Sequence, residues 1–471
     1  MSSADRSKVH NAIHEMRAFL AGQRFAWLGM GPANCIGLAR HMCFDLLICR
    51  RYGLDTEAAA ARVGAELICE ELESGERRGG GGGVEGLLQG PIAHRIAAAL
   101  TEGPRRVISW CSTETMEALA AASNDSLQIL AVPVAVQEQF EDKVVFRRAL
   151  PELGIQPVPH SICHLCEVDF AQSERRFGLP FVVQMATGYG GSGTFFVTSP
   201  DQLLSLQSEK DDQEVTVSKY IAGLAPNVTA VVLDDGLLMA HPTVQLVGVP
   251  QCVDWPPKYC GNDFVAAKQL PQRVIQTLLE QTRKIGVWMA GRGFRGLFGI
   301  DSVVDGPHVY PLEINPRLQG STAILTELQN VSAQLPLWLV HVVGHLDGGQ
   351  ELLRRLELQR PTPGPLCGSR VNIRNLKNDW CEVGGLLQPG VYEWDGTQAA
   401  YRRAGLTVAD CQAPDEFVVT GGVPTPGKRV GPRAGLCEIH TRHAVLDGAS
   451  NRLQPWAEGV IEWVRAVLAL A

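Results

Sequence analysis

Three polar side chains alternate along one short apolar segment in the second half of the chain. Glu313, Asn315 and Arg317 stand two residues apart in the segment Tyr-Pro-Leu-Glu-Ile-Asn-Pro-Arg. Alternate side chains of a β-strand share one face, so a carboxylate, an amide and a guanidinium would project together. Oxygen ligands suit Mg²⁺, and arginine suits phosphate or carboxylate oxygens. The pattern predicts a strand that binds a metal ion and an anion.

A second acid is expected beside this strand. Residues 296–304 have the composition of a partner strand and contain Asp301, and a turn sequence, Asp-Gly-Pro, follows at 305–307. We therefore expect a hairpin that places Asp301 close to Glu313. Two acids and one amide on a hairpin can hold the metal ions that bridge nucleotide phosphates. The alternative is a solvated strand face that binds nothing.

A glycine-rich segment, residues 186–194, lies between two predicted strands and reads Ala-Thr-Gly-Tyr-Gly-Gly-Ser-Gly-Thr. It is expected to cap a hairpin, because it has neither the lysine-serine ending nor the following helix of a P-loop. The backbone N–H groups of such a loop can close over an anion, with Ser192 and Thr194 as hydroxyl donors. A flexible hairpin without a ligand would have the same sequence, and the loop alone does not distinguish the two.

The composition is that of a soluble globular protein with several domains. The chain has 471 residues, of which 45% are hydrophobic and 20% are charged. The net charge of -8 argues against a nucleic-acid partner. No apolar run is long enough to cross a membrane, and the polar start lacks the apolar core of a signal peptide, so a cytoplasmic location is expected. The thirteen cysteines are accordingly expected to be reduced thiols.

Strand and helix patterns divide the chain into three regions. Residues 1–135 alternate short apolar strands with helices, which predicts an α/β domain with a parallel sheet. Residues 136–350 contain the motifs above, with a glycine-loop subdomain at about 155–222 and a helix that starts near Ser321 and reaches the apolar stretch 337–343. A proline-rich linker at 361–365 opens a small mixed α/β domain, 361–471, which ends in an amphipathic helix.

The order of these parts resembles that of the ATP-grasp superfamily over about residues 140–335. A lysine at a helix start, a strand, a glycine hairpin, further strands and an acidic strand follow one another. The resemblance implies an α/β (α+β) class and an ATP-grasp fold, preceded by a Rossmann-like pre-ATP-grasp domain. The region is more similar to the carboxylate–amine ligases and biotin carboxylases of the superfamily than to the glutathione synthases.

The resemblance also implies roles for individual residues. Lys143 matches the first nucleotide-phosphate lysine, and Arg317 matches the arginine that steadies the acyl phosphate; these are the predicted catalytic residues. Asp301, Glu313 and Asn315 match the ligands of Mg²⁺, for which Mn²⁺ is the alternative. The predicted ATP-binding residues are Lys143, Gln184, Gly190, Gly191, Ser192, Gly193, Thr194, the hinge residues Lys219, Tyr220 and Ile221, and Asn227 near the ribose.

Two positions depart from the family pattern. Gln184 stands where the family has a lysine that touches the α-phosphate and adenine, and Ser218 stands where the hinge begins with an acid. Glutamine still forms hydrogen bonds, but the lost charge would weaken ATP binding by roughly 1–2 kcal/mol. The departures therefore concern the mode of nucleotide contact, and the metal-binding strand is intact.

The activity that the resemblance implies is amide or peptide bond formation between a carboxylate and an amine, through an acyl phosphate, with release of ADP and phosphate. Small-molecule partners, first of all amino acids or peptides, and a homodimer are expected on family grounds. Three alternatives stay open: a biotin-carboxylase-like enzyme, another phosphoryl-transfer enzyme, and a non-catalytic nucleotide-binding module, which Gln184 and Ser218 would suit.

Overall fold

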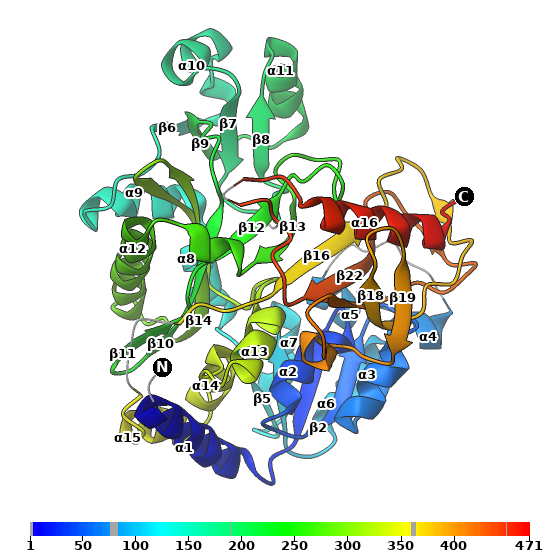
Figure 1. Cartoon of the computed structure of the whole chain (residues 1–471). Coiled ribbons are helices and arrows are strands. Elements are labelled where there is room, and N and C mark those ends of the chain that lie inside the picture. The colour runs from blue at the N-terminus through cyan, green and yellow to red at the C-terminus, as the bar shows by residue number, and fades with distance from the viewer. Residues whose placement is uncertain (1–2, 76–82, 189, 359–363, 449) are drawn as a thin grey trace.

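Residues 3–75, 83–188, 190–358, 364–448 and 450–471 are described by the computed structural model of the protein (Figure 1). Its N-terminal part is a five-stranded sheet in the order β3-β2-β1-β4-β5, and all pairs are parallel, as predicted. The strands are β1 (Phe25–Gly29), β2 (Phe44–Cys49), β3 (Glu66–Cys69), β4 (Arg105–Ser109) and β5 (Leu127–Ile129). The helices are α1 (Ser3–Leu20), α2 (Ile36–Ala39), α3 (Thr56–Val63), α4 (Glu70–Ser74), α5 (Gly83–Leu88), α6 (Ala93–Thr101) and α7 (Glu114–Ala121).

Both faces of this sheet are covered, which explains why its strands are continuous apolar runs. Ala26 and Leu28 of β1 pack into one cluster, whereas Phe25 and Trp27 point to the other face. There the ring of Trp27 meets the ring of Trp338, with centroids 5.6 Å apart. Because Trp338 follows the predicted metal-binding strand in sequence, the N-terminal sheet and the central region share one core.

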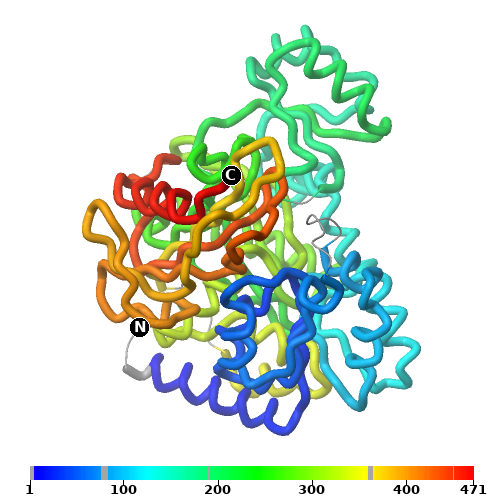
Figure 2. The backbone as a smooth tube through the Cα atoms, turned by 90° about the vertical axis from the view of Figure 1, so that its right-hand side faces the viewer, coloured from blue at the N-terminus to red at the C-terminus, as the bar shows by residue number. Residues whose placement is uncertain are grey.

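A four-stranded antiparallel sheet carries the glycine-rich segment and projects from the rest of the molecule (Figure 1, Figure 2). Its order is β6-β9-β7-β8, and the glycine-rich segment joins β7 and β8 as a hairpin, as predicted. Gln184 lies opposite Thr194 in this hairpin. The elements are β6 (His160–His164), β7 (Phe181–Met185), β8 (Thr194–Val197), β9 (Glu214–Lys219), α10 (Phe170–Phe177) and α11 (Pro200–Glu209). Two helices precede this sheet, α8 (Val134–Glu141) and α9 (Lys143–Glu152).

One large antiparallel sheet extends through the central and C-terminal regions in the order β15-β14-β10-β12-β13-β16-β22-β20-β18-β19, with β11 paired to β10. Asp301 and Glu313 lie opposite each other on β14 and β15, as predicted. The strands are β10 (Pro226–Leu233), β11 (Gly236–Met239), β12 (Thr243–Val247), β13 (Tyr259–Asp263), β14 (Gly296–Asp305), β15 (His308–Asn315), β16 (Ser369–Arg374), β18 (Gly390–Trp394), β19 (Ala399–Arg403), β20 (Glu416–Thr420) and β22 (Gly435–Thr441). A short separate pair is β17 (Cys381–Glu382) with β21 (Arg429–Val430).

The C-terminal region completes this sheet, because β16 pairs directly with β13 of the central region. A single apolar cluster contains Val244 of β12, Val371 of β16 and Val460 of the last helix. That helix, α16 (Pro455–Leu468), is the predicted amphipathic helix. Of the predicted linker at 361–365, the first three residues lie outside the described residues.

The remaining helices are α12 (Gln272–Ala290), α13 (Thr322–Val331), α14 (Leu337–Gly344) and α15 (Gly349–Arg355). The prediction of one helix from Ser321 to Val343 is therefore wrong, since the chain forms two. Ala333, between them, has a φ of +50°, and Pro336 precedes α14. Left-handed backbone and a proline both interrupt a helix, although the apolar pattern continues on either side.

No helix of the described part of the chain is long and apolar enough to cross a bilayer. The thirteen cysteines are all free.

Asp55 joins the N-terminal part to the C-terminal strands. Its side chain is buried, and its carboxylate accepts hydrogen bonds from the N–H groups of Gly421, Gly422 and Val423 at 2.7–3.1 Å. The hydroxyl of Thr420 donates a further bond. One carboxylate thus accepts hydrogen bonds from several backbone N–H groups of the turn that follows β20.

Replacing Asp55 by alanine should lower the free energy of unfolding by about 2–4 kcal/mol, because it leaves buried N–H groups without an acceptor. Urea denaturation measures this loss. The matched control is Asp211→Ala, which removes an exposed acid and should change stability by less than about 0.5 kcal/mol. Equal stability of the two variants would contradict the role given to Asp55.

Candidate active site

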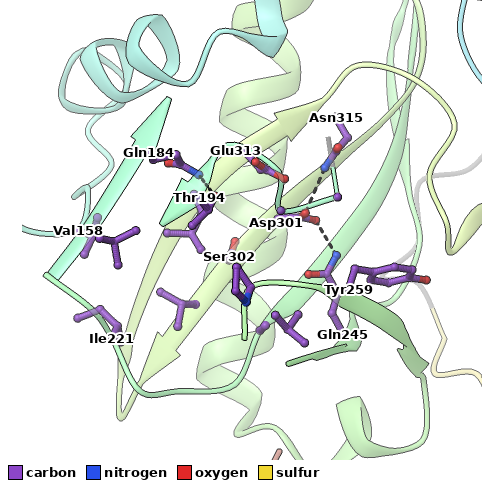
Figure 3. A pocket seen from close by; sticks show the side chains of 18 of the residues that line it. Val158, Gln184, Thr194, Ile221, Gln245, Tyr259, Asp301, Ser302, Glu313 and Asn315 are labelled. Atoms are coloured by element: carbon purple, nitrogen blue, oxygen red, sulfur yellow. Dashed lines mark hydrogen bonds between the residues drawn. The ribbon is translucent and has the colours of Figure 1, made fainter. Parts of the chain in front are cut away.

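A pocket of about 300 Å³ lies where the glycine-loop sheet meets the large sheet (Figure 3). Strands β7, β8 and β9 form one wall, and β12, β14 and β15 form the other. The predicted site residues that line it are Gln184, Gly190, Gly191, Thr194, Lys219, Tyr220, Ile221, Asp301, Glu313, Asn315 and Arg317. Motifs that are far apart in the sequence therefore face one cavity.

Two acids lie side by side in this pocket. Asp301 and Glu313 are register partners on the antiparallel strands β14 and β15. Withdrawal from water, together with the negative charge of Glu313, raises the pKa of Asp301 to about 7. The protonated, neutral form of Asp301 therefore persists to a higher pH than it does for an exposed aspartate.

Three amides donate hydrogen bonds to Asp301. Asn227 and Gln245 donate to Oδ1 at 2.5 and 3.0 Å, and Asn315 donates to Oδ2 at 3.2 Å. Figure 3 shows the bonds from Gln245 and Asn315. Asn227 is fully buried and lies behind Asp301, so its amide orients this acid; its contact with the ribose stays a prediction.

Lys143 links the acid pair to the glycine-rich segment. Asp142 caps helix α9 by accepting bonds from the N–H groups of Val144 and Val145, so the helix begins at Lys143. The Lys143 ammonium lies 3.4 Å from Glu313 and donates to the carbonyl of Gly188 at 3.0 Å. Lys143 therefore lies behind the pocket wall, where its positive charge offsets the negative charge of the two acids.

Arg147 is a buried cation that lines the pocket one helical turn after Lys143. Its Nε and Nη1 atoms are buried and have no hydrogen-bond partner among the described residues. Burial lowers the pKa of its guanidinium to about 10, against the opposing attraction of Glu313. A buried charge without a partner is costly, so this arginine is suited to an anion bound in the cavity.

Arg317 is held in place by an acid outside the strand. Its Nε donates to Glu141 of α8 at 2.9 Å, and its Nη2 lies 3.4 Å from the amide oxygen of Asn315. The ion pair is largely buried, which fixes the orientation of the guanidinium at the rim of the acid pair.

The other end of the pocket is apolar. Val158, Val303 and Tyr310 form a small buried cluster, against which Ile221 and Leu312 pack. The predicted hinge, residues 219–221, borders this end of the pocket. An apolar slot of this kind, beside the hinge, is suited to a planar base.

The glycine-rich loop reaches across to the segment before β13. Gly190 and Gly191 adopt positive φ values of 57° and 87°, and a β-carbon on Gly191 would lie 2.6 Å from the carbonyl oxygen of Pro257. Glycine is therefore required for this close approach. Ser192 and Gly193 belong to the same loop but do not line the cavity, and Tyr189 lies outside the described residues.

Among the residues that line the pocket, the sequence did not indicate Arg147, Gln245 or Gln319. Two of them had a local signal: Arg147 follows Lys143 by four residues on one helix face, and Gln319 continues the alternation of 313, 315 and 317. Gln245 had none, because only the pairing of β12 with its neighbours brings it to the site. The turn that begins at Tyr259 could be read from the sequence either as part of the site mouth or as a plain Asx turn, and Tyr259 lines the pocket.

A family profile described as an ATP-grasp domain matches residues 140–321. The chain contains an ATP-grasp domain. The match covers both the glycine hairpin and the acidic strand, which are the motifs that line the pocket.

Solved ATP-grasp structures share the fold over most of the chain. The biotin carboxylase domain of 2-oxoglutarate carboxylase from Hydrogenobacter thermophilus is 12% identical, with 90% of this chain and 86% of that chain covered and a TM-score of 0.53. N5-carboxyaminoimidazole synthase from Aspergillus clavatus is 15% identical, with 93% and 99% covered and a TM-score of 0.53. Pyruvate carboxylase from Rhizobium etli is 15% identical, with 90% and 36% covered and a TM-score of 0.57.

The donor set of this ATP-grasp domain fits a divalent cation. Asp301 and Glu313 offer two carboxylates and Asn315 an amide oxygen, all hard oxygen ligands. Among the described residues, no group of three or more His, Cys, Asp or Glu side chains could hold a metal ion, and this pair provides two carboxylates. Magnesium held by few carboxylates and by substrate phosphates has this composition.

The raised pKa of Asp301 predicts a pH-dependent stability in the metal-free protein. The pKa of about 7 in the folded state exceeds the ordinary aspartate value of 3.8, so the folded state binds one more proton than the unfolded state between these two pH values. Stability from this group is complete below about pH 4 and is lost as pH rises through 7, by an amount on the order of a few kcal/mol.

Urea denaturation at pH 5 and pH 8 tests this with Asp301→Asn as the comparison. The wild type should lose stability relative to the variant as pH rises, and saturating Mg²⁺ should reduce that loss. If the free energies of unfolding of the two metal-free proteins changed with pH in parallel, the raised pKa of Asp301 would be contradicted.

Proposed function

We propose that the protein is an ATP- and Mg²⁺-dependent ligase that joins a carboxylate to an amine through an acyl phosphate, with release of ADP and phosphate. The observation that carries this proposal is the content of one pocket: an acid pair with an amide, a glycine hairpin, and the cations Arg147 and Arg317. An amino acid or a peptide is the first choice for each substrate.

The pocket has an apolar end and a charged end, and this arrangement suits a nucleotide. The apolar slot and the hinge at 219–221 would take the base, and the loop at 190–194 would cover the terminal phosphates near Glu313. Arg147 lines the same pocket, and the charge of Glu313 attracts its guanidinium. It would supply the positive charge that Gln184 lacks.

Asp301, Glu313 and Asn315 would hold the Mg²⁺ ion. When bound, the ion supplies positive charge to the phosphate oxygens. The three amides on Asp301 would keep this acid oriented toward the metal, and Lys143 would balance the second acid.

In the first step, an oxygen of the substrate carboxylate attacks the γ-phosphorus, and the bond from that phosphorus to the ADP oxygen breaks. In the second, the amine attacks the acyl carbon, phosphate leaves and the amine loses a proton. Arg317, fixed by Glu141, would hold the substrate carboxylate and then the oxyanion. Closure of the glycine loop would exclude water from the acyl phosphate.

Carboxylation is the second candidate, and the structural comparisons favour it. The Hydrogenobacter domain was solved with MgADP and bicarbonate. Bicarbonate is a small carboxylate that the same pocket could phosphorylate, with transfer of the carboxyl group to a nitrogen atom as the second step.

ADP and phosphate release with Mg²⁺-ATP decides between the two. We expect release that requires one carboxylate and one amine together and that falls at least 100-fold in Glu313→Ala. Release that depends on bicarbonate would instead favour carboxylation. Tight ATP binding without release, across amino acids, small carboxylates and bicarbonate, would refute both and favour a nucleotide-binding module.

Arg147→Gln should weaken ATP binding about tenfold or more, because a charge-assisted contact is lost, while stability is kept or increases as an unpaired buried charge disappears. The neighbouring Arg148→Gln is the matched control. Arg148 is exposed and pairs with Glu214, so its loss should leave ATP binding unchanged. Calorimetry and thermal unfolding measure the two effects, and unchanged ATP affinity in Arg147→Gln would show that Arg147 does not contact the nucleotide.

A further inference from the structure

A second cavity, of about 460 Å³, lies at the amino edge of the N-terminal sheet. It is lined by residues from the segments 14–23 and 39–43, which lead directly into β1 and β2. The candidate active site lies toward the carboxyl edge of the same sheet, where the N–H of Leu318 donates to the carbonyl of Trp110, just after β4, at 3.1 Å. In both views α1 lies at the opposite end of the molecule from the sheet with the glycine-rich segment (Figure 1, Figure 2). The two cavities are therefore separate.

Basic side chains from two segments line this second cavity. Arg17 comes from α1 and Arg40 from the segment before β2, and His14 and His41 stand beside them. Among the described residues, no Asp or Glu lines the cavity. Within the same part of the chain, the side chains of Arg17 and Arg40 form neither a hydrogen bond nor an ion pair. The cavity thus has an excess of positive charge.

Helix ends account for only part of this excess. Arg17 lies in the last turn of α1, where a cation is stabilised by the free carbonyl groups. Arg40 follows α2, which has only four residues. The end of a full helix has a partial charge of about half a negative unit, so it offsets a fraction of the charge of two arginines.

Two polar atoms of residues that line the cavity are buried and have no hydrogen-bond partner among the described residues, His41 Nδ1 and Gln23 Oε1. His41 Nε2 lies 2.7 Å from Oδ1 of Asn330, whose own amide donates to the carbonyl of Gly37 at 2.8 Å. Oδ1 is therefore the acceptor and Nε2 carries the proton, which leaves Nδ1 unpaired. Buried polar atoms are costly to leave unpaired, and the cavity beside them has room for a polar ligand.

The charge of His41 depends on both arginines. Burial lowers the pKa of His41, and the charges of Arg17 and Arg40 lower it further, although the bond to Asn330 raises it. An anion between the two guanidinium groups would offset their charge and favour the protonated imidazole. Nδ1 would then carry a proton that it could donate to the anion.

We propose that Arg17, Arg40 and His41 bind a doubly negative oxyanion of a small molecule in the cavity between α1 and the segment 39–43. A phosphoryl group and a pair of carboxylates share this chemistry. Each guanidinium presents paired N–H donors that match either group, and a neutral ligand would leave the two cations unpaired. The site contains none of the residues of the candidate active site, so it does not depend on the ligase assignment.

The exposed thiol of Cys43 lines the cavity and reports its occupancy. The full chain is titrated with inorganic phosphate and, separately, with succinate, at an ionic strength fixed with sodium chloride. Mass spectrometry measures the rate at which iodoacetamide alkylates Cys43. We expect one of the anions to slow this rate by at least about threefold, because a bound anion covers the thiol and disfavours its thiolate. The anion with the lower midpoint identifies the source of the negative charge.

Arg17→Gln and Arg40→Gln should each raise that midpoint about tenfold, because each removes a charge-assisted contact with the anion. Both side chains are exposed, so these variants should fold as the wild type does. The matched control is Arg6→Gln, which removes an exposed cation about three turns earlier on α1 and should leave the midpoint unchanged.

Cys166 gives a control within the same molecule, because it is exposed on the glycine-loop sheet and should be alkylated at the same rate with and without the anions. Glu313→Ala should keep the protection of Cys43, since Glu313 lies outside this cavity. An unchanged rate at Cys43 with both anions, equal protection of Cys43 and Cys166, or a wild-type midpoint in both arginine variants would overturn the inference.

Discussion

Two carboxylates face each other across the β14–β15 hairpin, and the surrounding structure is organised by their repulsion. Like charges opposite each other in an antiparallel pair are destabilising. Three amides donate to Asp301, Lys143 contacts Glu313, and Arg147 is buried nearby without a partner of its own. Even so, burial and then the charge of Glu313 raise the pKa of Asp301 to about 7. A divalent cation bound here would offset the charge of both acids.

The single large sheet explains how regions far apart in sequence contribute to the same site. Pairing of β13 with β16 places the C-terminal strands in line with β12. Gln245 and Tyr259 line the pocket, and Arg370 of β16 donates to the carbonyl of Gly320, which also lines it. The N-terminal sheet is anchored by Trp27 against Trp338 and by Asp55 on the turn after β20. The C-terminal region is thus part of the site's framework and shares its core.

Local sequence patterns predicted the fold correctly where the structure depends on turn residues and on the alternation of polar and apolar side chains. The β14–β15 hairpin follows from Asp305 and Gly306, and the β7–β8 hairpin follows from its glycine-rich segment. The helix expected between Ser321 and Val343 was wrong, because the apolar pattern continues on both sides of a break that only the backbone at Ala333 reveals. Hydrophobic periodicity indicates which face of a helix is apolar, but it does not indicate where one helix ends and the next begins.

The sequence by itself determined which side chains were available for chemistry and which elements would carry them: the acids at 301 and 313, the amide at 315, and the glycines of the hairpin. Only the tertiary structure decided that Arg147 is buried and unpaired, that Asn227 supports Asp301, and that Gln245 and Tyr259 line the same pocket as the acids. The physical reason is that turn and strand preferences are local, whereas burial, charge balance and proton affinity depend on which distant segments pack around a group.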